Sequence, residues 1–183
     1  LLAKMTERPV KIVMSYWEEL TASNPTHPTF VTIRSGMTRD GHLTAREVRT
    51  VHASGAYGAM KPRSFLSTSH YVGGGYRIPN TSFEFLQVCT NTTPGGYFRA
   101  PGAHQYTFAL ECHTDLLAQE LGMDPAEFRR INLVDPGDED AVGRPLRVAD
   151  VRPVLEAALE ATRGGNPRRV RATAGESPSS AVR

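Results

Sequence analysis

The stretch TNTTPGGYFRAPGAHQYTFALECHTDLLAQELGMDP, residues 90–125, leads from the end of a strand-like run into a long helix-like run. Gly95 and Gly96 allow the backbone to approach another group closely, because neither carries a Cβ. Arg99 offers a planar fork of hydrogen-bond donors, and a helix beginning at Ala103 has unpaired amides and a positive dipole end at its start. These features suit a cradle for an anionic group. A strand-to-helix turn with a surface arginine explains the same residues equally well.

The helix that follows this loop is predicted over residues 103–121. Its polar side chains fall on one narrow stripe and apolar side chains surround most of the rest, which indicates a largely buried helix. The stripe consists of Thr107, Glu111, Thr114 and Asp115. Gly122 is expected to end the helix as a C-terminal cap.

Two more helices are predicted after Gly122. Asp124-Pro125 supplies an N-cap followed by proline at the first helical position, which predicts a helix over residues 125–132. Asp150 caps a last helix, over residues 151–163, whose apolar positions repeat with helical spacing. Beyond it, residues 164–183 show no periodicity and are expected to be a disordered tail.

Upstream of the loop, the sequence alternates between strand and helix signals. The run RPVKIVMS, residues 8–15, predicts a strand, and the Ser15 and Glu18 pair has the form of a capping box that begins a helix over residues 16–22. The residues before residue 8 resemble the end of an amphipathic helix. This pattern predicts that the sequence is a piece of a longer protein.

A hairpin is predicted around Asp40-Gly41, since glycine tolerates the positive φ of such turns. Its first strand places Val31, Ile33 and Met37 on one face, and the broken alternation between Val48 and Val51 predicts a bulge. Residues 61–75 are interpreted as an irregular connection, and Phe83 to Val88 as a strand. The fold class is therefore α+β, with a hairpin around Asp40-Gly41 and three C-terminal helices.

Composition excludes several classes of function. The net charge of +2 comes without a basic run interleaved with aromatic residues, so no nucleic-acid partner is predicted. No apolar run reaches the length of a membrane span. Cys89 and Cys112 have neither disulfide nor metal spacing; we interpret them as small buried hydrophobic residues and predict a cytoplasmic location, with the periplasm as the alternative.

Without any family knowledge the residues offer no catalytic set. Six histidines are scattered without the spacing of a metal site, and no serine lies in a nucleophile elbow. Glu111 is interpreted as a carboxylate bonded to backbone amides of the preceding loop, with a catalytic base as the alternative.

The longer motifs give a resemblance. GYFRAPGAHQYTFALECHTDLLAQELGMDPAEFRRINL, together with the upstream segments RPVKIVMSYWEEL, SGMTRDGHLTA, SGAYG, YRIPN and TNTTPGG in the same order, resembles the molybdenum-binding large subunit of the xanthine dehydrogenase and aldehyde oxidase family. The resemblance covers residues 1–161. It implies that residues 1–163 are a partial molybdopterin-binding domain.

This resemblance implies a cofactor, a reaction and partners. The cofactor is a molybdenum-molybdopterin dinucleotide, and Phe98, Arg99, Ala100 and Gln105 match the residues that approach it. A molybdenum-bound hydroxyl attacks an aldehyde or N-heterocycle, hydride passes to a sulfido ligand, and electrons leave to iron–sulfur clusters and FAD on partner subunits or domains.

Positions at which the sequence departs from the family limit the reactions that the resemblance implies. Ser67 and Pro101 stand where xanthine-oxidising members have an arginine and an aromatic residue, which argues against purine hydroxylation. Aromatic residues at 97 and 98 argue against carbon monoxide oxidation. The catalytic glutamate of the family is expected outside this chain, so the fragment alone is expected to be inactive. The alternative is a non-catalytic remnant or a subunit-docking module of the same fold.

Overall fold

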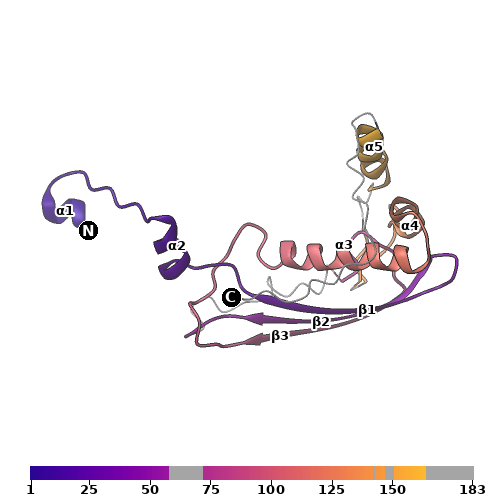
Figure 1. Cartoon of the computed structure of the whole chain (residues 1–183), viewed down its shortest axis with the longest axis horizontal. Coiled ribbons are helices and arrows are strands. Elements are labelled where there is room, and N and C mark those ends of the chain that lie inside the picture. Colours follow the sequence, from indigo (N-terminus) through magenta and orange to yellow (C-terminus); the bar gives the residue numbers. More distant parts are fainter. Residues whose placement is uncertain (58–71, 142, 147–150, 164–183) are drawn as a thin grey trace, which may run out of the picture.

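The computed structural model describes residues 1–57, 72–141, 143–146 and 151–163. Its helices and strands form an α+β fold, which confirms the predicted fold class (Figure 1). Their bounds are α1 Leu2–Thr6, α2 Tyr16–Ala22, β1 Thr29–Met37, β2 Leu43–Ala53, β3 Asn80–Val88, α3 Ala103–Glu120, α4 Pro125–Asn132 and α5 Arg152–Arg163. The predicted tail, the Asp150 cap and most of the connection over residues 61–75 lie outside the described residues.

A three-stranded sheet in the order β1-β2-β3 forms one layer of the fold. β1 and β2 are antiparallel and are joined by the predicted hairpin, in which Gly41 has a φ of 92°. β3 runs parallel to β2 on the other side. The hairpin prediction is confirmed. Its turn needs a positive φ, which glycine adopts without the steric strain that a side chain would cause.

The bulge was predicted at the wrong place. The register shift lies between Gly36 and Met37, whereas Val48 and Val51 pair regularly with Ile33 and Phe30. The apolar alternation breaks along β2 for another reason: several polar side chains occupy the core-facing positions beside Val48. These are Arg46, Thr50 and His52, each at most 1% exposed.

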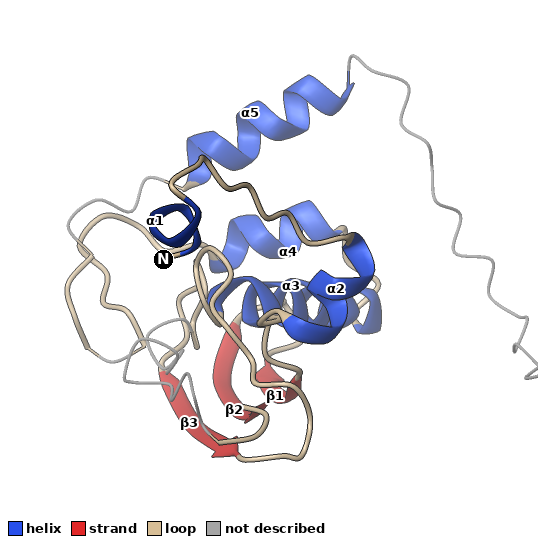
Figure 2. Ribbon diagram, turned by 90° about the vertical axis from the view of Figure 1, so that its left-hand side faces the viewer, coloured by secondary structure: helices blue, strands red, loops and turns tan. Residues whose placement is uncertain are grey.

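Helix α3 lies along one face of the sheet, and α4 packs at its C-terminal end (Figures 1 and 2). The core between these layers consists of buried residues from β2, the turn before β3, α3 and α4. They are Leu43, Val48, Val72, Tyr76, Tyr106, Leu110, Ala118, Phe128 and Leu133.

The prediction that α3 is largely buried was wrong. Only the stripe Tyr106, Leu110, Thr114 and Ala118 is buried, while Phe108 is 74% and Leu116 is 61% exposed. Thr114 therefore belongs to the buried stripe and not to a solvent-facing one. Its hydroxyl donates to Leu110 O at 2.9 Å, which satisfies it within the helix.

The predicted N-terminal caps of α2 and α4 are confirmed. Ser15 N donates to Glu18 Oε2 at 2.7 Å and Glu18 N donates to Ser15 Oγ at 3.3 Å, which completes the capping box. Asp124 Oδ1 accepts hydrogen bonds from the amides of the first turn of α4 at 2.9 and 3.0 Å. Gly122, with a φ of 66°, follows the end of α3 as predicted.

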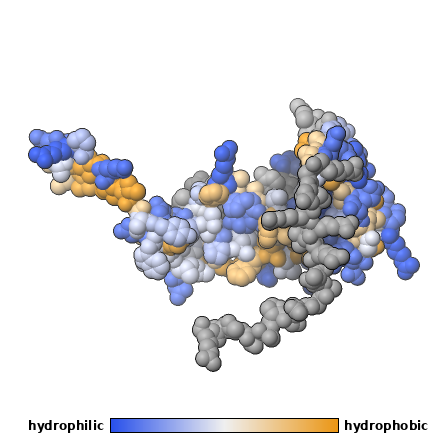
Figure 3. Space-filling model, turned by 45° about the horizontal axis from the view of Figure 1, so that its top comes forward, coloured by the Kyte–Doolittle hydropathy of each residue, from blue (hydrophilic) through white to orange (hydrophobic). Residues whose placement is uncertain are grey.

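The strand predicted over residues 8–15 is wrong. These residues have no regular secondary structure apart from the turn that ends α1, and they form an exposed arm with α1 and α2 (Figures 1 and 3). Within the described residues no strand pairs with them, and an unpaired strand lacks the hydrogen bonds that stabilise it. Ile12, Val13 and Trp17 are each more than 70% exposed on this arm.

The two cysteines also differ from the prediction. Cys89 and Cys112 are free and exposed. Cys89 follows the last residue of β3, and Cys112 lies on the solvent side of α3, so neither position reaches the core.

Candidate cofactor-binding site

The loop from Pro94 to Gly102 connects the segment after β3 to the start of α3, and its first half is tied to two distant segments. Gly95 N donates to Ser54 O, just after β2, at 3.0 Å, and Gly96 N donates to Pro25 O, between α2 and β1, at 2.7 Å. These bonds hold the beginning of the loop against the end of the sheet.

The two glycines serve contacts within the chain. A Cβ on Gly95 would lie 2.7 Å from Cδ2 of the buried His27 ring, and a Cβ on Gly96 would overlap Asn24. The amides of both glycines are already used in hydrogen bonds within the chain, so neither amide is free to donate to a ligand. Their missing side chains allow the loop to lie against the chain beneath it.

The second half of the loop carries three of the predicted site residues in exposed positions. Phe98 is 63% exposed, and its ring meets the His104 ring edge-on with centroids 5.6 Å apart. Ala100 has a φ of 57°, a conformation that favours glycine, and its carbonyl accepts a hydrogen bond from Ala103 N at 3.0 Å. Arg99 lies exposed between them.

Arg99 and the start of α3 present unused donors. The ion pairs of the described residues do not include Arg99, and their backbone hydrogen bonds include none donated by Arg99, His104 or Gln105. Gly102 precedes the helix and supplies no side-chain cap. An uncapped helix start beside an exposed guanidinium favours an anionic group.

Gln105, the fourth predicted site residue, lies one helical turn beyond the loop. Its Nε2 donates to His27 O at 3.3 Å, while its Oε1 is buried and has no hydrogen-bond partner among the described residues. It lines an open groove of about 610 Å³ together with Thr29, Val31, His104, Phe108 and Ala109. A buried carbonyl oxygen without a donor is a position at which a ligand or water is expected.

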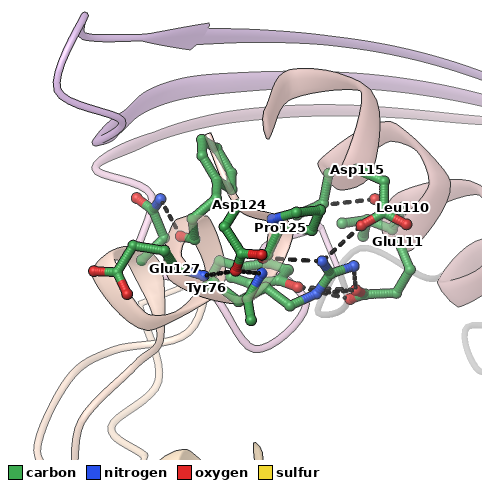
Figure 4. A network of polar contacts seen from close by, with 12 residues as sticks. Tyr76, Leu110, Glu111, Asp115, Asp124, Pro125 and Glu127 are labelled. Atoms are coloured by element: carbon green, nitrogen blue, oxygen red, sulfur yellow. Dashed lines mark hydrogen bonds and ion pairs between the residues drawn. The ribbon is translucent and has the colours of Figure 1, made fainter. Parts of the chain in front are cut away.

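Glu111 has partners other than those predicted. Its carboxylate accepts from Tyr76 Oη at 2.9 Å and from Arg129 Nη2 at 2.8 Å, and Arg129 Nη1 donates to Asp115 at 2.6 Å (Figure 4). Burial and then the nearby carboxylate raise the pKa of Tyr76, which keeps its hydroxyl a donor. Glu111 therefore joins α3 to α4 and to the turn before β3, and its partners are side chains where backbone amides were predicted.

Asn132 ends α4 and binds the hairpin. Its Nδ2 donates to Gly41 O at 2.7 Å and to Phe128 O at 2.9 Å, and its Oδ1 accepts from Leu43 N at 2.8 Å. The side chain is buried, and its oxygen and nitrogen are both used. Together with Arg129, this residue shows that the MDPAEFRRIN part of the resemblance is a structural element of the scaffold.

Arg46 was missed in the sequence and lies in the core. It is 1% exposed, its Nε donates to Ser35 Oγ at 3.1 Å, and its guanidinium lies 5.9 Å from the centre of the Tyr76 ring. Burial lowers its pKa, while nearby Tyr106, Tyr76 and Glu111 act in the opposite direction. The alternation with Val48 places residue 46 on the inner face, and this signal could have found it.

Comparisons with known proteins show which family the chain belongs to. The molybdopterin cofactor-binding domain family matches residues 1–133. One probable xanthine dehydrogenase component from Bacillus subtilis is 41% identical over 75% of the chain, and a nicotinate dehydrogenase large molybdopterin subunit of Eubacterium barkeri is 34% identical over 80%. The solved aldehyde oxidoreductase of Desulfovibrio gigas superposes on 91% of the chain with a TM-score of 0.71 and 33% identity.

The chain belongs to the molybdopterin cofactor-binding family of xanthine dehydrogenase and aldehyde oxidase large subunits. It spans 18% of the Bacillus protein, 34% of the Eubacterium protein and 19% of the aldehyde oxidoreductase chain. The chain therefore represents a partial region of proteins of this kind.

Two further findings concern membranes and metals. No helix of the described part of the chain is both long and apolar enough to cross a membrane. The same residues contain no group of three or more His, Cys, Asp or Glu side chains arranged to hold a metal ion directly.

Proposed function

We propose that this chain is a region of a molybdenum hydroxylase large subunit, in which the loop Pro94 to Gly102 and the start of α3 bind a molybdenum-molybdopterin dinucleotide. Phe98, Arg99, Ala100 and Gln105 are the residues assigned to binding. The observation that carries this proposal is the exposed Arg99 next to unused amides at the start of α3.

The donor set fits the chemistry of such a cofactor, which carries phosphate and other electron-rich oxygen atoms. Arg99 supplies a planar cation that donates several hydrogen bonds, and the helix start favours negative charge. The buried Oε1 of Gln105 offers an acceptor for an N–H group. Phe98 presents an exposed apolar ring on the same loop, next to the His104 ring.

When bound, the cofactor supplies the two-electron oxidation that transfers an oxygen atom from water to the substrate. The residues of this chain orient the cofactor and compensate its charge, while the tie between Gln105 and His27 fixes the start of α3. No residue of the chain is assigned a catalytic role. We therefore propose that the chain alone does not turn over substrate.

The substrate class in this proposal is a small aldehyde or N-heterocycle. The names of the similar aldehyde oxidoreductase and nicotinate dehydrogenase support it. Electrons pass to iron–sulfur and flavin partners, a proposal consistent with relatives that are named as single subunits of larger enzymes. The exposed free thiols of Cys89 and Cys112 suit a reducing compartment, and the cytoplasm is proposed, with the periplasm as the alternative.

Metal analysis of the full-length protein, expressed with its neighbouring subunits, tests the proposal. Arg99→Ala and Gln105→Ala are expected to lower the molybdenum content per protein, whereas Arg39→Ala, an exposed arginine on the hairpin, leaves it unchanged. A correctly folded full-length protein that never contains molybdenum would contradict the assignment. Equal loss in the Arg39 variant would show that the effect is unspecific.

One observation favours the alternative of a docking module without cofactor. The arm formed by α1, residues 9–15 and α2 has no buried residue in either helix and exposes large apolar side chains (Figure 3). Such surface is typical of a region that contacts other protein. A full-length protein that binds its partners through this arm but retains no molybdenum would favour the alternative.

A further inference from the structure

Two buried histidines lie near each other, and one of them contacts the loop proposed to bind the cofactor. His27, in the segment before β1, is 3% exposed, and His52, near the end of β2, is fully buried. Their ring centres are 6.3 Å apart. Neither residue stands out in the sequence, where the six histidines are scattered without the spacing of a metal site.

His27 contacts both ends of the loop. Its ring fills the space in which a side chain on Gly95 would lie, with Cδ2 at 2.7 Å from the position of a Cβ. Its carbonyl accepts the hydrogen bond from Gln105 Nε2 at 3.3 Å. Because the same residue touches the beginning of the loop and the first turn of α3, its position determines how the residues between them are presented.

His52 supports His27 from the sheet. Its ring lies 5.0 Å from the Phe85 ring, and its Nδ1 lies 3.4 Å from Thr29 Oγ1. Its Nε2 is buried and has no hydrogen-bond partner among the described residues. The ion pairs found in these residues do not include His52. A proton on this ring would therefore introduce a buried charge without a carboxylate beside it.

We propose that His27 and His52 are positioning residues for the loop Pro94 to Gly102: while the His52 ring is neutral they hold the loop in place, and protonation of His52 in acid loosens it. This inference rests on the proposed function only for what the loop binds. The contacts that carry it are those among His27, His52, Gly95 and Gln105 themselves.

The electrostatic surroundings agree with this role. Burial, and then the neighbouring His27, lower the pKa of His52 from 6.5 to about 4. Within the described part of the chain, the titratable group that faces His52 is His27, whose ring in turn lies 6.2 Å from the Tyr97 ring of the loop. At neutral pH the His52 ring is uncharged. In acid, a charge on the His52 ring lies 6.3 Å from the His27 ring, which contacts the loop at Gly95.

Amide hydrogen exchange of the full-length protein tests the proposal. The hydrogen-bonded amides of Gly95 and Gly96 report on the loop, and those of Thr38 and Gly41 report on the distant hairpin. After correction for the intrinsic pH dependence, exchange at the two loop glycines is expected to rise about tenfold between pH 7 and pH 4.5, with a smaller change in the hairpin.

Variants distinguish an effect of the two histidines on the loop from a general loosening of the protein in acid. His52→Gln, which cannot be protonated, is expected to keep the loop protected at pH 7 and to remove most of the acid-dependent rise. His42→Gln, at an exposed histidine of the hairpin, leaves the rise unchanged. His27→Ala is expected to raise exchange at Gly95 and Gly96 about tenfold already at pH 7, as a local opening.

The proposal is overturned if the wild-type loop shows no acid-dependent step, or if the full step persists in His52→Gln. Should His27→Ala fail to fold, His27→Gln takes its place and is expected to reduce the step. The exchange measurement does not depend on bound cofactor. A full-length wild-type protein that contains no molybdenum but shows the acid-dependent rise in exchange at Gly95 and Gly96 would contradict the proposed function alone. A protein that contains molybdenum but shows no such rise would contradict this inference alone.

Discussion

Arg129 donates two hydrogen bonds to the same carboxylate oxygen of Glu111, from Nη2 at 2.8 Å and from Nε at 3.1 Å. The arginine side chain is 18% exposed and the glutamate side chain 40% exposed. The pair joins α4 to α3 at the edge of the core, where solvent screens it less than a surface pair.

Arg129→Ala is expected to lower the free energy of unfolding by about 2 kcal/mol, between the values for exposed and buried pairs. The matched control is Arg49→Ala, since Arg49 pairs with Glu84 where both side chains are more than half exposed. That variant should lose only about 0.5 kcal/mol. Urea unfolding of both variants measures the difference, and equal losses would contradict the role given to Arg129.

Asn132 leads to a second prediction, because its side chain satisfies three backbone groups. Asn132→Ala leaves Leu43 N and Gly41 O buried without this partner and is expected to destabilise the protein by about 3 kcal/mol. Asn80→Ala removes one hydrogen bond at an exposed site and is expected to change stability by less than about 1 kcal/mol. Thermal unfolding distinguishes the two, and a mild effect of Asn132→Ala would mean that water replaces its contacts.

Local signals predicted the elements of this fold well. The Ser15 capping box, the Asp40-Gly41 turn and the Asp124 cap depend on residues a few positions apart, so the sequence contains all the partners. The strand expected over residues 8–15 failed because strand formation depends on a pairing partner, which the described residues do not provide.

The candidate site was only partly predictable for the same reason. Exposure of Arg99 follows from its place in a short loop between regular elements. The role of Gly95 depends on His27, which is far away in the sequence, and the partner of Glu111 is on another helix. The two glycines indicated a backbone that can approach another group closely, and in the fold their amides attach the loop to distant parts of the chain.

The contact between Gly95 and His27 gives a third prediction. Gly95→Ala places a methyl group 2.7 Å from the buried His27 ring, so we expect a loss of about 2 kcal/mol in stability. Gly75→Ala is the control, because a Cβ there meets nothing within 4 Å and its φ lies outside the range that strains a side chain. Chemical denaturation of both variants provides the test, and equal stabilities would show that the loop moves away freely.

The last prediction concerns acid. The pKa of His52 in the folded protein is lowered to about 4 by burial and by His27, against 6.5 for an ordinary histidine, so the unfolded chain binds the proton more tightly. The neutral ring therefore contributes its full stability above pH 6.5, and this contribution is lost progressively as the pH falls from 6.5 toward 4. The loss at pH 4 is about 3 kcal/mol relative to pH 7.

Carboxylates with lowered pKa values, such as that of Asp138, also lose stability in acid, so the wild-type curve alone does not isolate the histidine. The difference between the curves of wild type and His52→Gln isolates the contribution of His52, since glutamine does not titrate. Unfolding free energies measured by denaturant at pH 7 and pH 4.5 are expected to show an acid loss about 2 kcal/mol smaller in the variant. His113→Gln provides a second comparison, because burial, and then Arg46, lower the pKa of His113 too. Identical acid losses in wild type and His52→Gln would mean that water reaches the ring and that His52 titrates as an ordinary histidine.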